Sequence, residues 1–271
     1  MKRVLGFIAA LSFMAPAGAM ASTKTFTVQP FASISVAAGI ALKVEVGPPQ
    51  SIVAETDGDF SDLVIEARGG DLFIGRPPRW FSFGWDRGPD YKVTVTVPAL
   101  HGLETSSSAV ADVSGSITGN AEIAASSSGR ANVSEIQGGS VSLAVSSSGD
   151  IEIASLQASS MEAHAASSGH AKVAQLRAGT VEVHASSSGV VEASGSCTTL
   201  TAEASSSGHI LAGKLECATL LAQVSSSGGV EGFASKSFEG RASSGGSVTV
   251  GGKPAQVQKD ESSGGVIDVR N

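Results

Sequence analysis

The sequence predicts an all-β protein built as a single-stranded, right-handed parallel β-helix, a solenoid with about 20 residues per coil. Two observations support this prediction: a Ser-Ser-Ser-Gly string that recurs at nearly constant spacing, and an alternation of apolar and polar residues between its copies. A fixed period of this length is typical of repeat architectures, and strict alternation is typical of β-strands. No apolar stripe with the helical period of about 3.6 residues runs through the repeats, so helices are not expected there.

The serine–glycine string marks the successive coils. The intervals between its glycines are 20, 20, 20, 19, 20, 17 and 19 residues, a regularity that disordered serine-rich sequence does not keep. Copies lie at Ser126–Gly129, Ser146–Gly149, Ser186–Gly189, Ser205–Gly208 and Ser225–Gly228, with altered versions ending at Gly169, Gly245 and Gly264. We expect the glycine at a corner that needs a positive φ angle. The serine two positions earlier has inward parity, so we expect its hydroxyl to be hydrogen-bonded along the stack.

One face of each expected strand is apolar and the other is polar. Around Gly149, for example, Leu143 and Val145 precede the glycine and Ile151 and Ile153 follow it, all with the same parity. A strand of this length cannot bury its apolar face alone. Coiling places each strand about 4.8 Å from its counterpart in the next coil, and the apolar columns then merge into one narrow core.

The chain divides into a regular and an irregular part. Residues 101–271 carry the repeat and are expected to end in a final strand at Gly265–Arg270. Residues 22–100 lack the string but keep alternating stretches, at 31–36, 40–46, 63–65, 72–74 and 91–97. We expect these stretches to be irregular starting coils of the same continuous domain, with a separate small β-sandwich as the alternative.

Residues 1–21 have the pattern of a signal peptide. Lys2 and Arg3 precede the apolar stretch Val4–Met14, and Ala19-Met20-Ala21 is the small-x-small pattern that signal peptidase cleaves. The expected location is therefore the periplasm, the cell surface or the medium, and no transmembrane segment is expected in the mature chain. The formal net charge of −7, without basic clusters, argues against nucleic acid as a partner.

Cys197 and Cys217 are the only cysteines, and each lies eleven residues before its glycine. They therefore belong to one column in adjacent coils, at a spacing that suits a disulfide. Export makes oxidation plausible. The alternative is two small core residues that remain thiols.

An aromatic segment interrupts this aromatic-poor chain between residues 76 and 91. Arginine and aromatic clusters of this kind are favoured at binding sites, and the segment is also suited to cap the end of the solenoid. We name as candidate ligand- or partner-binding residues Arg79, Trp80, Phe81, Phe83, Trp85, Arg87 and Tyr91.

Two histidines and two glutamates form a polar patch on the outward face. His164 and His184 share one column, and Glu162 and Glu182 share the next. Such residues can bind a transition metal, but side chains on a flat, exposed sheet are expected to diverge, which favours a solvated polar face. In another outward column, Glu152, Lys172 and Glu192 alternate in charge and support the register.

No catalytic motif is present. The sequence lacks a nucleophile elbow, a P-loop and a dinucleotide fingerprint, so we expect neither enzymatic activity nor a cofactor. The leading hypothesis is an exported, non-catalytic binding or structural protein of the cell envelope, adhesin-like, whose partner is an envelope glycan or a surface protein. A carbohydrate-active enzyme on a β-helix and a self-assembling solenoid are the alternatives, and the oligomeric state is left open.

Several short motifs follow one another in order along residues 26–269. They are Phe31-x-x-Ile34-x-Val36, Lys43-Val44-Glu45-Val46, Asp71-Leu72-x-Ile74, the stretch Val93–Pro98 followed by Leu100 and Leu103, and strands of the form Ser146–Ile151. In this order they resemble the bacterial head GIN domain family, labelled putative autotransporter adhesins. The resemblance implies an exported β-solenoid and no established chemistry.

Overall fold

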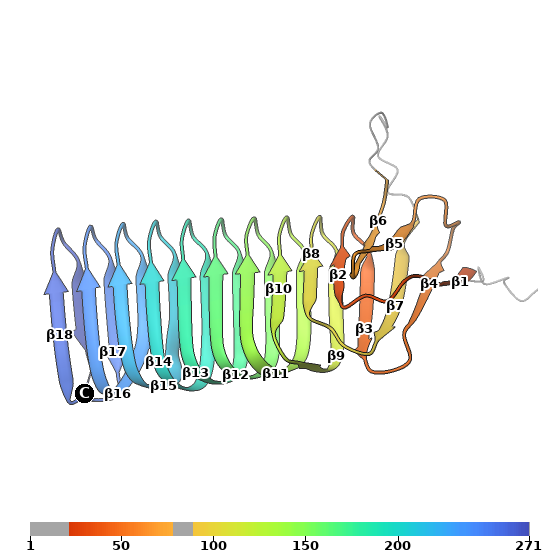
Figure 1. The fold of residues 1–271 in the computed structure, drawn as a ribbon. Helices are drawn as coiled ribbons and strands as arrows, with labels where there is room; N and C mark the ends of the chain where they lie inside the picture. Colours follow the sequence, from red (N-terminus) through yellow and green to blue (C-terminus); the bar gives the residue numbers. More distant parts are fainter. Residues whose placement is uncertain (1–21, 78–88, 271) are drawn as a thin grey trace, which may run out of the picture.

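The computed structural model describes residues 22–77 and 89–270, which form one sheet of nineteen strands and, within those ranges, no helix (Figure 1). The strands are β1 Ser22–Phe26, β2 Ser33–Val36, β3 Ala41–Val46, β4 Ser51–Thr56, β5 Val64–Arg68, β6 Asp71–Gly75, β7 Tyr91–Val97, β8 Gly102–Thr105, β9 Val110–Thr118, β10 Ala121–Ala125, β11 Arg130–Val145, β12 Asp150–Ala165, β13 His170–Ala185, β14 Val190–Ala204, β15 His209–Val224, β16 Gly229–Ala242, β17 Ser247–Gly251, β18 Gln256–Glu261 and β19 Val266–Val269. The predicted parallel β-solenoid is confirmed.

Strands β11 to β16 are the regular coils, and each pairs in parallel with its neighbours. Val141, Met161 and Val181 stand in register in three successive coils and are all buried. The inward residues of every coil merge into one apolar core that runs from Phe31 to Ile267. The predicted parity therefore holds, because a strand whose residues alternate can bury one face only by stacking it on the next coil.

The turns differ from the expectation in a specific way. In the Ser-Ser-Ser-Gly copies, positive φ angles fall on the second and third serines, as at Ser147 (50°) and Ser148 (63°), and not on the glycine that follows. The expected positive φ is found at Gly245 (75°) and Gly264 (79°), which replace the third serine of their turns. Gly149 is required for a different reason: a Cβ there would lie 2.4 Å from the carbonyl oxygen of Ala125 in the preceding coil. The glycine thus permits a close backbone approach, while the serines take the left-handed conformation.

The expectation that the serine two positions before the glycine points its hydroxyl inward is also wrong. Ser147 is exposed, because the two left-handed residues turn their side chains outward. The ladder along these turns is made by the backbone instead: the N–H of Ser128 donates to the Ser147 carbonyl oxygen at 3.2 Å, and the N–H of Ser148 donates to the Ser167 carbonyl oxygen at 3.2 Å. These bonds run toward the next coil and tie consecutive turns together.

The N-terminal end of the stack is closed by antiparallel strands. β2 and β3 lie parallel and in register with β8 and β9. Beyond them β4 pairs antiparallel with β7, β1 pairs antiparallel with β4, and β5 pairs antiparallel with β6. β1 and β4 were not expected from the sequence.

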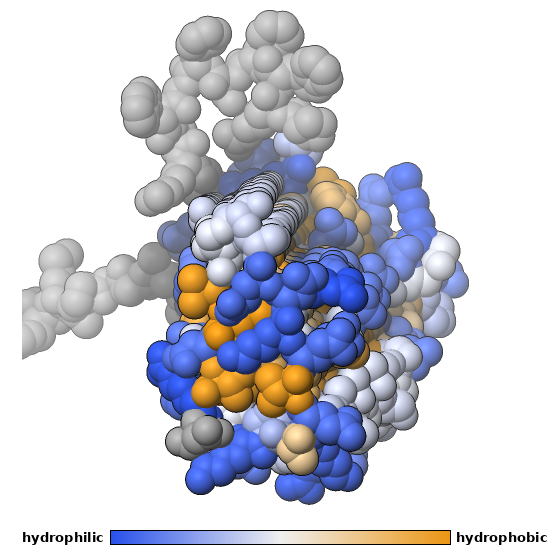
Figure 2. Space-filling view, turned by 90° about the vertical axis from the view of Figure 1, so that its left-hand side faces the viewer, coloured by the Kyte–Doolittle hydropathy of each residue, from blue (hydrophilic) through white to orange (hydrophobic). Residues whose placement is uncertain are grey.

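The C-terminal end carries charged residues at positions that are apolar or small elsewhere. In β18, Lys259 and Glu261 stand in register with the buried Gly240 and Ala242 of β16. The Lys259 Nζ donates to the Ile267 carbonyl oxygen at 3.1 Å, and the Ile267 N–H donates to Glu261 Oε1 at 2.6 Å. Figure 2 shows this end of the molecule, where a hydrophilic band crosses apolar surface. Inward charges of this kind protect an edge strand from further pairing.

Candidate functional site: a groove with a histidine–glutamate cluster

The two cysteines form the predicted disulfide. Cys197 in β14 stands directly opposite Cys217 in β15, with their Cα atoms 4.5 Å apart. Cys217 is buried and Cys197 is partly buried against the core. The disulfide joins two residues that are 20 positions apart in the sequence and crosslinks two adjacent coils.

Most of the predicted aromatic site lies outside the described residues, namely Arg79, Trp80, Phe81, Phe83, Trp85 and Arg87. Tyr91 is described, and its side chain is only 1% exposed. Its ring stacks against Phe60, the Arg76 guanidinium lies 4.8 Å from the ring centroid, and its hydroxyl donates to the Asp59 carbonyl oxygen at 3.0 Å. Tyr91 is therefore a core residue, which corrects its assignment as a ligand-contacting one. Burial raises the pKa of this phenol.

A groove runs along one corner of the solenoid, beside the serine turns. It consists of two hollows that share His184 and Ser186. One column of outward residues, which we call the groove column, lines it from coil to coil. The groove column is Glu104, Ala124, Ala144, His164, His184, Glu203, Gln223, Arg241 and Asp260. Its eight coil-to-coil steps span about 38 Å at ~4.8 Å each.

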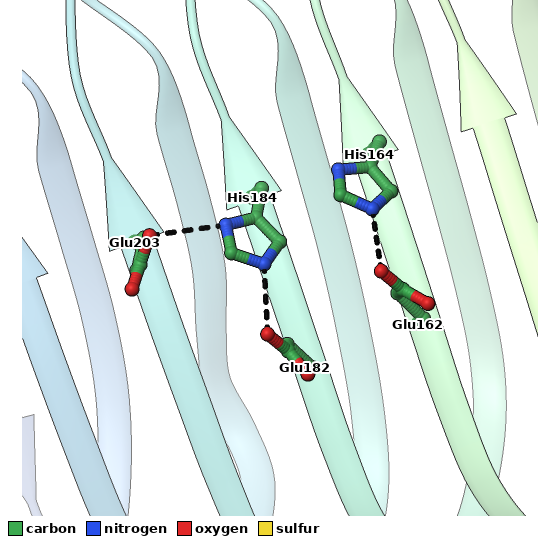
Figure 3. Close-up of polar contacts among 5 residues, drawn as sticks. All are labelled: Glu162, His164, Glu182, His184 and Glu203. Atoms are coloured by element: carbon green, nitrogen blue, oxygen red, sulfur yellow. Dashed lines mark hydrogen bonds and ion pairs between the residues drawn. The ribbon is translucent and has the colours of Figure 1, made fainter.

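The two histidines of the groove column stack face to face in the middle of the groove. The ring centroids of His164 and His184 are 4.8 Å apart, and their planes differ by only 6°. Each Nε2 faces a glutamate two residues earlier on its own strand: 2.7 Å from His164 to Glu162 Oε1, and 3.0 Å from His184 to Glu182 Oε1 (Figure 3). These side chains converge, contrary to the expectation that they would diverge.

A third carboxylate completes the cluster. Glu203 Oε2 lies 3.2 Å from His184 Nδ1, so both nitrogens of this imidazole face carboxylates (Figure 3). Sequence reasoning missed Glu203, although it lies five residues before Gly208, as His184 lies five before Gly189. The same count back from the glycine would have found it. We call Glu162, His164, Glu182, His184 and Glu203 the histidine–glutamate cluster.

The other outward column confirms the predicted charge alternation. Lys172 stands in register between Glu152 and Glu192, and its Nζ lies 3.6 Å from Glu152 Oε1. Neighbouring opposite charges on a sheet are favourable. The histidine–glutamate cluster breaks this rule, because Glu162 and Glu182 face each other in register.

Several solved structures are similar to this chain. A putative lipid binding protein from Parabacteroides distasonis aligns with a TM-score of 0.66 at 19% identity, over 93% of this chain and 97% of that one. A putative adhesin from Parabacteroides merdae aligns with a TM-score of 0.65 at 16% identity, over 93% of this chain and 96% of that one. A putative adhesin from Parabacteroides distasonis aligns with a TM-score of 0.60 at 20% identity, over 93% of this chain and 97% of that one. At these identities the likeness concerns the fold.

No curated protein matches the sequence. Among the described residues, no helix is long and apolar enough to span a membrane. The sequence model of the family "Putative auto-transporter adhesin, head GIN domain" matches residues 30–189 and, overlapping them, 142–254. Since these matches cover most of the chain, the protein belongs to the head GIN domain family.

Proposed function

We propose that this chain is exported and acts as a non-catalytic, adhesin-like binding protein of the cell envelope, which holds an extended polymer such as a glycan along the groove. The observation that carries the proposal is the continuity of the groove column across nine coils, from Glu104 to Asp260. A groove of about 38 Å suits an elongated ligand better than a compact one.

The lining of the groove supports a polar ligand. Serine residues at the start of each turn, such as Ser146, Ser186 and Ser225, border it, and the groove column offers carboxylate, amide, imidazole and guanidinium groups. These groups can donate and accept hydrogen bonds with saccharide hydroxyls. The family description as adhesin and the signal-like residues 1–21 also support an exported binding role.

The test is to block the groove without disturbing the core. Ala144 lines the groove at an exposed position, so Ala144→Trp places a large side chain in the path of a ligand. Gln157→Trp is the matched control, since Gln157 is exposed on β12 outside this groove. Both proteins and the parent are titrated with a panel of envelope glycans, with lipid vesicles included because one structural relative is described as lipid binding.

We expect Ala144→Trp to weaken glycan binding by roughly tenfold or more, and Gln157→Trp to leave it unchanged. Equal binding by all three proteins would show that the ligand does not lie in the groove and would contradict the proposal. A Trp80→Ala/Trp85→Ala variant, checked for folding by circular dichroism, separately tests whether the aromatic segment predicted from the sequence contacts the same ligand.

A further inference from the structure

We propose that Glu162, His164 and His184 bind a divalent transition-metal ion such as Zn²⁺, with Glu203 orienting the second imidazole and Glu182 adding a carboxylate beside the ion. The proposal is independent of the glycan hypothesis, because it concerns an ion and rests on the geometry and the charges of the histidine–glutamate cluster.

The ligand atoms are already close together. One donor atom each from Glu162, His164 and His184 lie within 4.8 Å of one another. In a tetrahedral zinc site, with metal–ligand distances near ~2.1 Å, the ligand atoms lie roughly 3.4 Å apart. The Glu162 and His164 side chains are 52% and 50% exposed, which leaves them room to rotate toward a shared ion.

The two rings present the same nitrogen on the same side, but their planes are parallel, so a ring has to tilt toward its neighbour before both lone pairs point at one ion. The two Nε2 atoms face the same side, toward the carboxylates of Glu162 and Glu182 (Figure 3). An ion placed there meets nitrogen and oxygen ligands together. Glu203 contacts Nδ1 of His184, the nitrogen turned away from the ion, and so holds the ring as outer-shell carboxylates do for metal-binding histidines, while Glu182 lies beside Nε2 on the side of the ion.

The charge pattern gives an independent reason. Among all the strand pairs of the described residues, Glu162 and Glu182 are the only two like-charged residues that face each other in register. Such a pair is destabilising by itself. Elsewhere Lys172 separates Glu152 from Glu192. No lysine separates the two glutamates of the cluster, and a bound divalent cation would supply the positive charge that offsets their repulsion.

The ligand types select the class of ion. Two imidazoles and carboxylates suit zinc, copper or nickel, whereas Ca²⁺ and Mg²⁺ require a shell of oxygen ligands. We therefore use ZnCl₂ as the probe and CaCl₂ as the negative control, after removal of bound metal with a chelator and dialysis.

Calorimetric titration of the purified protein is the first test. We expect one Zn²⁺ per chain, and we expect His164→Ala and His184→Ala each to weaken this binding by about tenfold or more. The matched control is His170→Ala, since His170 is also an outward histidine with a carboxylate nearby, Asp150 at 3.5 Å. It should bind Zn²⁺ as the parent does. Absence of binding by the parent, or equal binding by the parent and both cluster variants, overturns the proposal.

Thermal unfolding is the second test, because Glu182→Gln should change the unfolding temperature in opposite directions relative to the parent without metal and with Zn²⁺. Glu182→Gln removes the like-charge pair, so without metal its unfolding temperature should be at or above that of the parent. Added Zn²⁺ should raise the unfolding temperature of the parent and raise that of Glu182→Gln less, because binding to the folded state alone stabilises it in proportion to affinity. A parent protein whose unfolding temperature does not rise with Zn²⁺ contradicts the site.

Discussion

Lys259 reaches across the end of the last coil to Ile267, where its Nζ donates a hydrogen bond to the carbonyl oxygen at 3.1 Å. Glu261 accepts the N–H of the same residue. Around them Val257 and Val266 are 47% and 58% exposed. The end of the stack is thus apolar at its rim and charged across its middle, which bears directly on whether solenoids of this chain join end to end.

We predict that Lys259→Val/Glu261→Val associates as its concentration rises. The substitutions replace two inward charges by apolar side chains, and an apolar, unprotected edge strand favours pairing with another chain. Light scattering over a range of concentrations measures the effect. Gln258→Val is the control, because it adds the same side chain to β18 at an outward position. If the double variant scatters like the control, the charges are not what keeps this end from pairing.

We predict that Gly149→Ala lowers the free energy of unfolding by about 1–3 kcal/mol, the usual range for overpacking. The added Cβ would lie 2.4 Å from the Ala125 carbonyl oxygen, and the backbone of that coil cannot move without disturbing its own ladder. Chemical denaturation measures the change. Ser148→Ala, at the preceding exposed position with a φ of 63°, should have a much smaller effect. Equal effects of both substitutions would contradict the close-approach explanation.

We predict that Cys197→Ala/Cys217→Ala lowers stability by about 3 kcal/mol, the chain-entropy estimate for a loop of this size. Alanine suits the column, because Ala178 and Ala234 stand in register on either side of the two cysteines. The loss should therefore come from the crosslink and not from packing. The parent protein in a reducing agent is the control and should unfold at the same denaturant concentration as the variant.

We predict that stability falls at alkaline pH through Tyr91. Burial raises the pKa of Tyr91 in the folded state above its unfolded value of about 10. The stabilisation is therefore complete below pH ~10 and is lost as the pH rises through the folded-state pKa. Since Tyr91 is the only tyrosine, tyrosinate absorbance follows this group alone.

Tyr91→Phe is the matched variant for this titration. At neutral pH it should be less stable by about 1 kcal/mol, because the hydrogen bond to the Asp59 carbonyl oxygen is lost. Above pH ~10 the difference from the parent should shrink, since phenylalanine cannot ionise. A difference that stays constant across the alkaline range would mean that the phenol titrates as it does in the unfolded chain.

The spacing of the serine–glycine string was sufficient to place Cys197 beside Cys217 and His164 beside His184. In a parallel stack of coils of nearly equal length, residues at the same distance from the glycine become neighbours. The antiparallel strands β1 and β4 could not be found in this way. They lie outside the repeat, and β1 is exposed at four of its five positions, so it has no apolar periodicity to detect.

The sequence alone therefore determined the solenoid and, through the regular coils, its register and the columns that share a face, because all three follow from one period. In the last two coils the structure places Gly246 and Gly265, not Gly245 and Gly264, in line with the earlier glycines. Only the tertiary structure decided the role of Gly149, the convergence of His184 with Glu203 and the charged closure at Lys259. Each of these depends on the distance between atoms of different coils. Periodicity specifies which residues are neighbours, but the backbone path and the side-chain rotamers determine how closely they approach.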